Sequence, residues 1–153
     1  MEARINYAQV APGALDAMMQ VEKYAANSGL EHSLYELIKT RASQINGCAY
    51  CLDMHTKDAR RLGETEQRLY ALSAWRETPF YTEKERAALE WTEALTLIAE
   101  NDVPDSLYQR VRTHFDEKEI VDLSMAVIAI NGWNRLAISF RKVPGSYLPN
   151  GIK

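Results

Sequence analysis

The stretch ELIKTRASQINGCAYCLDMHTKDARRLG, residues 36–63, contains both cysteines of the chain and one of its three histidines. Apolar residues recur in it at helical spacing, first up to an asparagine-glycine pair and then from Cys48 to a stop at Gly63. The stretch therefore predicts two successive helices joined by a tight turn. At about 100° per residue, Cys48, Cys51 and His55 fall within an arc of about 60° on the second helix, so they can act together.

The rest of the chain shows the same helical periodicity, and the alternating pattern of half-buried strands is absent. Start signals mark several helices: Pro12 at a first helical position, Thr82 with Glu85 three residues later, and Asp116 before an apolar run. The sequence predicts an all-α fold of about six to seven helices, with the cysteine pair in the N-terminal part of a core helix. The expected helices cover about residues 12–27, 33–46, 48–62, 65–75 and 83–98, one from 105, and 117–141.

The last of these helices is apolar on almost every side, which is typical of a helix enclosed by others. A glycine in mid-helix costs about 1 kcal/mol against alanine, so another backbone is expected to approach closely at Gly132. Asn131, Trp133, Asn134 and Arg135 are unusual in such a helix. They could either line the thiol pocket or bond to neighbouring subunits, and the structural role is favoured because a buried polar group mostly needs hydrogen-bond partners.

Composition fits one soluble domain, residues 1–153, because hydrophobic residues make up 46% and charged residues 25% of the chain. The most apolar region, 123–140, contains two asparagines and an arginine, so no membrane segment is expected. The opening MEARINYAQVAPG has no basic segment followed by an apolar one, which favours a cytoplasmic location. A net charge of −3 with scattered basic residues gives no reason to expect nucleic acid.

The residues alone leave three interpretations of the cysteines open. In a reducing compartment a permanent disulfide is not expected, and redox work or metal binding is favoured. A Cys-x-x-Cys pair with a histidine supplies three of four zinc ligands, but His32 and His114 form no second cluster. Two buried thiols without chemistry are the third interpretation. For redox work, the start of a helix favours a thiolate at Cys48, and His55, one turn beyond Cys51, can carry a proton.

A family resemblance adds to this pattern. Glu36, Cys48, Cys51 and His55, in the order Glu-x11-Cys-x2-Cys-x3-His, resemble the signature of the alkyl hydroperoxidase D (AhpD) core in the carboxymuconolactone decarboxylase superfamily. INGWNRLAISFR, residues 130–141, is similar to the terminal helix of that core. The resemblance covers about residues 15–141. It implies an all-helical fold in which the cysteine helix packs beside the glutamate helix, and a homo-oligomer that is a dimer, trimer or hexamer.

The activity that the resemblance implies is that of a peroxiredoxin-like thiol peroxidase. Cys51 would attack the hydroperoxide and Cys48 would resolve the sulfenic acid as a disulfide. Glu36 would act as a base, and His55 would relay the proton. The chemistry is consistent with this assignment, since a thiolate is the nucleophile and a nearby thiol intercepts the sulfenic acid before further oxidation.

The resemblance also implies the partners: a small-molecule hydroperoxide as substrate, and a lipoyl-bearing or thioredoxin-like dithiol donor as reductant, with no metal or other cofactor. Founding members with a lipoyl-linked relay have a histidine between the cysteines, where this chain has Tyr50. A phenol with a pKa near about 10 is a poor proton shuttle at neutral pH but can donate a hydrogen bond. Tyr50 and Trp133 are expected to contact substrate. The alternatives are decarboxylation of a small lactone, as the superfamily name suggests, and a non-enzymatic redox sensor.

Overall fold

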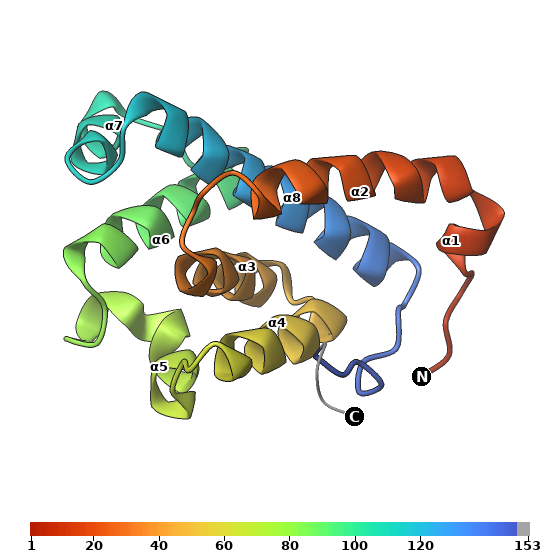
Figure 1. Ribbon diagram of the computed structural model, residues 1–153. Coiled ribbons are helices and arrows are strands. Elements are labelled where there is room, and N and C mark those ends of the chain that lie inside the picture. The colour runs from red at the N-terminus through yellow and green to blue at the C-terminus, as the bar shows by residue number, and fades with distance from the viewer. Residues whose placement is uncertain (150–153) are drawn as a thin grey trace.

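The computed structural model describes residues 1–149, and these form helices and no strand, which confirms the all-α prediction (Figure 1). The one-turn α1 and the 3-10 helix η1 accompany seven longer α-helices. Their bounds are α1 (Tyr7–Val10), α2 (Pro12–Ala26), α3 (His32–Asn46), α4 (Ala49–Arg61), α5 (Glu66–Ala71), η1 (Leu72–Glu77), α6 (Glu83–Thr96), α7 (Asp105–Arg112) and α8 (Glu117–Ser139).

Local signals explain most helix boundaries. Thr82 and Glu85 form a reciprocal capping box before α6, and Asp116 forms the same arrangement before α8. The Thr65 side chain accepts a hydrogen bond from a backbone N–H in the first turn of α5. Gly47, with φ 69°, ends α3 in the left-handed conformation. These contacts lie within a few residues of each other, so the sequence alone could reveal them.

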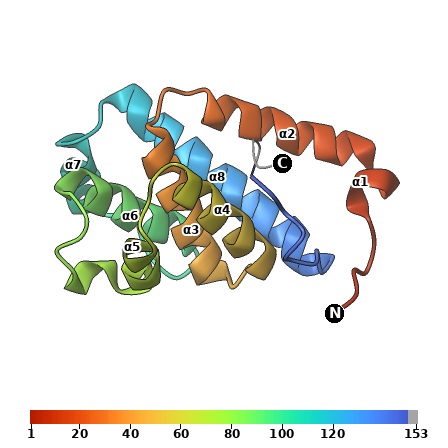
Figure 2. The ribbon, with the colours of Figure 1, turned by 60° about the horizontal axis from the view of Figure 1, so that its bottom comes forward.

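α3 is the central helix, and it packs against α4, α6 and α8 (Figures 1 and 2). α2 runs along the outer side of α8 and covers it. The largest apolar cluster joins α3, α6, α7 and α8. Its most deeply buried members are Ile38, Ala88, Val111, Leu123 and Val127.

Two expectations for α8 are wrong in part. The helix is not enclosed on all sides, because Val121 and Ile128, two turns apart on one face, are 55% and 54% exposed, and Ile138 near its end is 45% exposed. Gly132 is not approached by a backbone. A Cβ there would lie 2.6 Å from Cε of Met18, so the space is taken by a side chain of α2.

After α8 the chain turns back over α4. Arg141, with φ 53°, reverses the chain direction. The backbone N–H of Lys142 then donates a hydrogen bond to Ala137 O at 2.9 Å, which closes the end of α8. Farther along, the Gly145 N–H donates to Asp53 Oδ2 at 3.0 Å. This C-terminal segment therefore borders the helix that carries the cysteines. Among residues 1–149 no helix is both long and apolar enough to cross a bilayer.

Candidate active site

The turn between α3 and α4 places both thiols. Since Gly47 ends α3, Cys48 becomes the N-cap residue of α4 and Cys51 lies in the first turn. Both cysteines are free thiols, and each is only 1% exposed. They pack in one cluster with Ala42 of α3 and with Ile130 of α8, so three helices hold the pair in the interior.

The two thiols share one proton unequally. The S–H of Cys51 donates to the Cys48 sulfur, and backbone N–H groups of Cys51 and Tyr50 point at the same sulfur; together they outweigh burial and lower the pKa of Cys48 to about 7. The same hydrogen bond, followed by burial, raises the pKa of Cys51, which Lys39 only partly opposes. Of the two thiols, Cys48 is therefore the one that ionises more readily.

Glu36 and His55 meet across the α3–α4 contact. Nδ1 of His55 lies 2.8 Å from Oε2 of Glu36, and the histidine is 2% exposed. The carboxylate fixes the ring and holds a proton at Nδ1. Within the described part of the chain, Nε2 of His55 is buried and has no hydrogen-bond partner. That nitrogen is free to exchange a proton with a substrate or a water.

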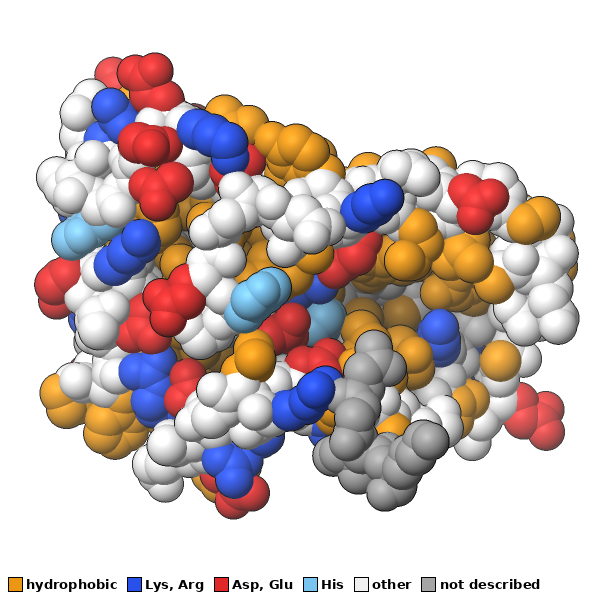
Figure 3. All heavy atoms as spheres, in the orientation of Figure 1, with side chains coloured by type: hydrophobic (Ala, Val, Ile, Leu, Met, Phe, Trp, Pro, Cys, Tyr) orange, Lys and Arg blue, Asp and Glu red, His pale blue; other side chains and the backbone are white. Residues whose placement is uncertain are grey.

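A cavity of about 480 Å³ gives access to one thiol. Cys51, Glu36 and His55 line it, together with side chains from α1, α2, α8 and the C-terminal segment. Cys48 lines a shallower hollow of about 170 Å³ with Gly47. In Figure 3, acidic, basic and histidine side chains gather in a depression below α2, beside a stretch of hydrophobic ones. Cys51 is thus the thiol that faces the larger space.

A second ion pair, which no pattern in the sequence indicates, borders this cavity. Glu22 of α2 pairs with Lys39 of α3, which is 3% exposed, and accepts hydrogen bonds from Tyr35 Oη and Trp133 Nε1, each at 2.9 Å. Burial alone would raise the pKa of Glu22, but Lys39 and these donors hold it below its usual value. Lys39 lies on the same face of α3 as Glu36. Its partner Glu22 comes from α2, so the pair forms only because α2 packs there.

Asp58 and Tyr147 close another part of the cavity wall. The Tyr147 hydroxyl donates to both carboxylate oxygens of Asp58, at 2.8 and 2.9 Å. Burial raises the pKa of Asp58, against the hydrogen bond from Tyr147, and the neighbouring Glu36 raises it further. Lys57 also donates to the Tyr147 carbonyl, at 3.0 Å. These bonds hold the C-terminal segment against α4.

Asn131, Asn134 and Arg135 of α8 make hydrogen bonds within the chain, which fits a structural role. Asn134, fully buried, donates to Ser43 Oγ at 3.1 Å and accepts from Asn46 Nδ2 at 2.8 Å. Its amide also lowers the pKa of both thiols. Trp133 is different because it borders the cavity, as does Tyr50. Both residues expected to contact substrate therefore line the space that Cys51 faces.

The described residues contain one cluster of potential metal ligands. One ligand atom each of Glu36, His55 and Asp58 lies within 4.8 Å of the others, and neither cysteine sulfur belongs to this group. His32 is exposed at the start of α3, and His114 lies beyond the end of α7. The arrangement thus differs from the two-sulfur zinc clip that the spacing left open.

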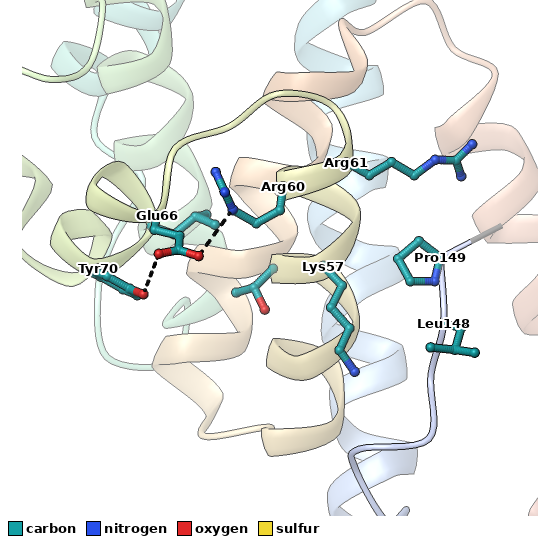
Figure 4. A pocket seen from close by; sticks show the side chains of 9 residues that line it. Lys57, Arg60, Arg61, Glu66, Tyr70, Leu148 and Pro149 are labelled. Atoms are coloured by element: carbon teal, nitrogen blue, oxygen red, sulfur yellow. Dashed lines mark hydrogen bonds and ion pairs between the residues drawn. The ribbon is translucent and has the colours of Figure 1, made fainter. Parts of the chain in front are cut away.

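A larger cavity, of about 640 Å³, lies between α4, α5 and the C-terminal segment (Figure 4). Lys57, Arg60 and Arg61 of α4 face it, and Arg60 pairs with Glu66 at 3.7 Å. Neither cysteine borders it. Of these two cavities, only the one of about 480 Å³ is therefore bordered by a thiol.

Fold and site together define an all-helical protein with a buried dithiol beside a glutamate–histidine pair. The model of the carboxymuconolactone decarboxylase family matches residues 12–94, more than half of the chain. The uncharacterized protein YdfG of Bacillus subtilis is 52% identical over 139 residues, which are 91% of this chain and 95% of YdfG. The chain belongs to the carboxymuconolactone decarboxylase family.

Solved structures show the same fold. A protein of unknown function from Agrobacterium tumefaciens, proposed to be the antioxidant defence protein AhpD, superposes with a TM-score of 0.92 at 49% identity, over 95% of this chain and 100% of that one. The AhpD-like resemblance seen in the sequence is thus confirmed. The debrominase Bmp8 superposes with a TM-score of 0.73 at 18% identity, over 88% of this chain and 73% of that one, which shows the fold alone.

Proposed function

We propose that the protein is a thiol-dependent peroxidase that reduces organic hydroperoxides or hydrogen peroxide with Cys51 and Cys48. The observation that carries the proposal is the cavity in which Cys51 lies with the Glu36–His55 pair, while Cys48 shares a proton with Cys51 from behind. The AhpD-like fold and the named antioxidant relative support a peroxidase-related role.

In the first step Cys51 loses its proton, and His55 Nε2 or the Cys48 thiolate accepts it. The Cys51 thiolate attacks the terminal oxygen of ROOH, so an S–O bond forms and the O–O bond breaks. The leaving RO⁻ takes a proton to give ROH, and Cys51 becomes a sulfenic acid. The Glu36–His55 pair is placed to deliver that proton because Nε2 is otherwise unpartnered.

In the second step the Cys48 sulfur attacks the sulfenic sulfur of Cys51, forming a disulfide and releasing water. Two thiols and one hydroperoxide thus give one disulfide, one alcohol and one water. A pKa of about 7 suits Cys48 to this role, since a large fraction of it is thiolate at neutral pH. An external dithiol, either lipoyl-bearing or thioredoxin-like, then reduces the disulfide.

The test uses the reduced protein and cumene hydroperoxide. We expect two thiols to be consumed for each peroxide, with an intramolecular disulfide in the product. In Cys48→Ser, a sulfenic acid at Cys51 should be trapped by dimedone and located by mass spectrometry. The matched Cys51→Ser should react much more slowly. Survival of both thiols would refute the peroxidase, and trapping at Cys48 alone would reverse the two roles.

Lactone decarboxylation is a second candidate, because the matching family carries that name. The chemistry of a lactone opening does not need two thiols. A Cys48→Ser, Cys51→Ser double variant should then keep full turnover of a small carboxylated lactone. Loss of that turnover would remove this candidate.

We also propose that the chain forms a homo-oligomer through the apolar face of α8. Val121 and Ile128, seven residues apart, point to the same side of the helix, and neither is covered within residues 1–149. Light scattering during gel filtration measures the mass. Ile128→Lys should shift the protein to monomer if this face is the interface, whereas Lys84→Glu on α6 should not.

A further inference from the structure

The cavity of the proposed peroxidase contains one cation that lacks a carboxylate partner among residues 1–149. Lys142 makes no ion pair there, and its Nζ instead lies over the rings of Tyr50 and Tyr7, 4.6 and 5.7 Å from their centroids. Every other charged group of the lining is paired. The pairs are Glu22 with Lys39, Glu36 with His55, and Asp58 with the Tyr147 hydroxyl.

The end of α8 holds Lys142 at the mouth of this cavity. The left-handed Arg141 turns the chain, and the Lys142 N–H bonds back to Ala137 O at 2.9 Å, so the lysine follows a fixed helix terminus. Lys142 itself is exposed, while its side chain borders the cavity. It therefore stays charged and hydrated and can exchange its contacts with the tyrosine rings for a stronger anionic partner.

Of the three acidic groups of the cavity, Glu22 and Glu36 are engaged by Lys39 and His55, and Asp58 lies farthest along α4 from Tyr50. Asp58 follows Tyr50 by eight residues on α4, which places it about 12 Å farther along the helix axis. Cys51 is the neighbour of Tyr50 in sequence. Cys51 and Lys142 line the same cavity, so a substrate whose carboxylate binds at Lys142 can reach the reacting thiol while the carboxylate stays apart from Asp58.

The remaining lining suits an apolar body. Leu15 and Met19 of α2, Met54 of α4, and Trp133 and Ala137 of α8 contribute hydrocarbon, sulfur and indole surface. A volume of about 480 Å³ lies within the range of small-molecule sites and accommodates an aromatic or short aliphatic compound. Apolar walls with one unpaired cation at the entrance fit an amphipathic anion.

We propose that the preferred substrates are organic hydroperoxides that carry a carboxylate, and that Lys142 binds this carboxylate while the apolar walls hold the hydrocarbon part near Cys51. The inference rests on the proposed peroxidase function and specifies its substrate class. The basic cavity of Figure 4 is a poorer site for such a substrate. Lys57 pairs there with Asp53 at 2.8 Å, Arg60 pairs with Glu66, and no thiol borders it.

A purely structural role for Lys142, holding α1 to α4 through the two tyrosine rings, makes a different prediction. Its loss would then slow the reduction of charged and neutral hydroperoxides alike. Only a lysine that contacts the carboxylate changes the ratio between them. The preference between two matched substrates therefore separates the two roles.

The experiment compares cumene hydroperoxide with its para-carboxylate derivative, which differs by one anionic group. We expect kcat/KM to favour the carboxylate by about tenfold in the unmodified protein, as for one charge-assisted hydrogen bond. Lys142→Met should abolish that preference, by lowering kcat/KM for the carboxylate about tenfold more than kcat/KM for cumene hydroperoxide, and Lys142→Arg should retain most of it. Lys84→Met, on α6, makes the same change in net charge and should behave as the unmodified protein.

Three outcomes would overturn the inference. The unmodified protein shows no preference for the carboxylate, or Lys142→Met keeps the preference, or Lys142→Met slows both substrates equally. In each case cumene hydroperoxide is still reduced and the peroxidase proposal stands. If neither hydroperoxide is reduced by the unmodified protein, the proposed function fails and the inference fails with it.

Discussion

The pKa of Cys48 depends on a donor that a single substitution removes. The S–H of Cys51 is the largest cause that lowers this pKa from 9.0 to about 7. Cys51→Ala deletes the donor and leaves only the backbone N–H groups and Asn134 to oppose burial. We expect the pKa of Cys48 to rise by at least about one unit, equivalent to about 1.4 kcal/mol. At neutral pH its thiolate fraction should fall from about one half to about one tenth or less.

Cys51→Ser is the matched control, since its hydroxyl has a similar size and can still donate to the Cys48 sulfur. Each variant holds a single cysteine, so the ultraviolet absorbance of the thiolate reports Cys48 alone. Titration from about pH 5 to about pH 10 covers both expected midpoints. The serine variant should titrate near 7 and the alanine variant clearly higher.

The same shift links pH to stability. The pKa of Cys48 is lower in the folded chain than its ordinary value of 9.0, so the unfolded chain binds more protons between about 7 and 9.0. The free energy of folding that this thiolate contributes is therefore complete above pH 9.0 and is lost as the pH falls through about 7.

In the titration of the two variants, equal midpoints near 7 would show that the start of the helix, and not Cys51, stabilises the Cys48 thiolate. Midpoints near the ordinary thiol pKa of 9.0 in both variants would refute a stabilised thiolate at Cys48.

Three further substitutions test other contacts. Glu36→Gln should lower kcat/KM for cumene hydroperoxide by about a hundredfold or more, because the proton relay loses its base; an unchanged steady-state rate would exclude that role. Tyr147→Phe removes a hydroxyl that donates to Asp58 and should cost about 1 kcal/mol in urea unfolding, with no loss expected if the segment is held by other bonds. Gly132→Ala should change stability by less than about 1 kcal/mol, since helix propensity rises while the flexible end of Met18 moves aside. A loss of about 2 kcal/mol in the free energy of unfolding, measured by thermal unfolding, would mean that the Met18 side chain cannot move aside.

Helix boundaries were predictable because their causes are local. A capping box needs only Thr82 and Glu85, and a left-handed stop needs only Gly47. The one-turn α1 was not predicted, since four residues are too few for a period to show. The open face of α8 was missed for a different reason. Ile128 is apolar whether or not a neighbour covers it, so its exposure depends on how the helices pack.

The side chains that surround the thiols were predictable only in part. Glu36 was identified through the family pattern, and its contact with His55 is found at 2.8 Å. Glu22, Lys39 and Lys142 gave no signal in the sequence. Single charged residues on helices are usually solvated, and nothing in the local pattern tells the solvated ones from those turned into a cavity.

The sequence by itself determined that Cys51 and His55 share one helix face and that Cys48 stands at the start of that helix. Those relations follow from fixed angles between residues a few positions apart. Only the tertiary structure decided that Cys51 borders the cavity of about 480 Å³, that Lys39 pairs with Glu22, and that the C-terminal segment returns to border the site. Distances between helices depend on how all their side chains fit together, and spacing along one helix does not contain that information.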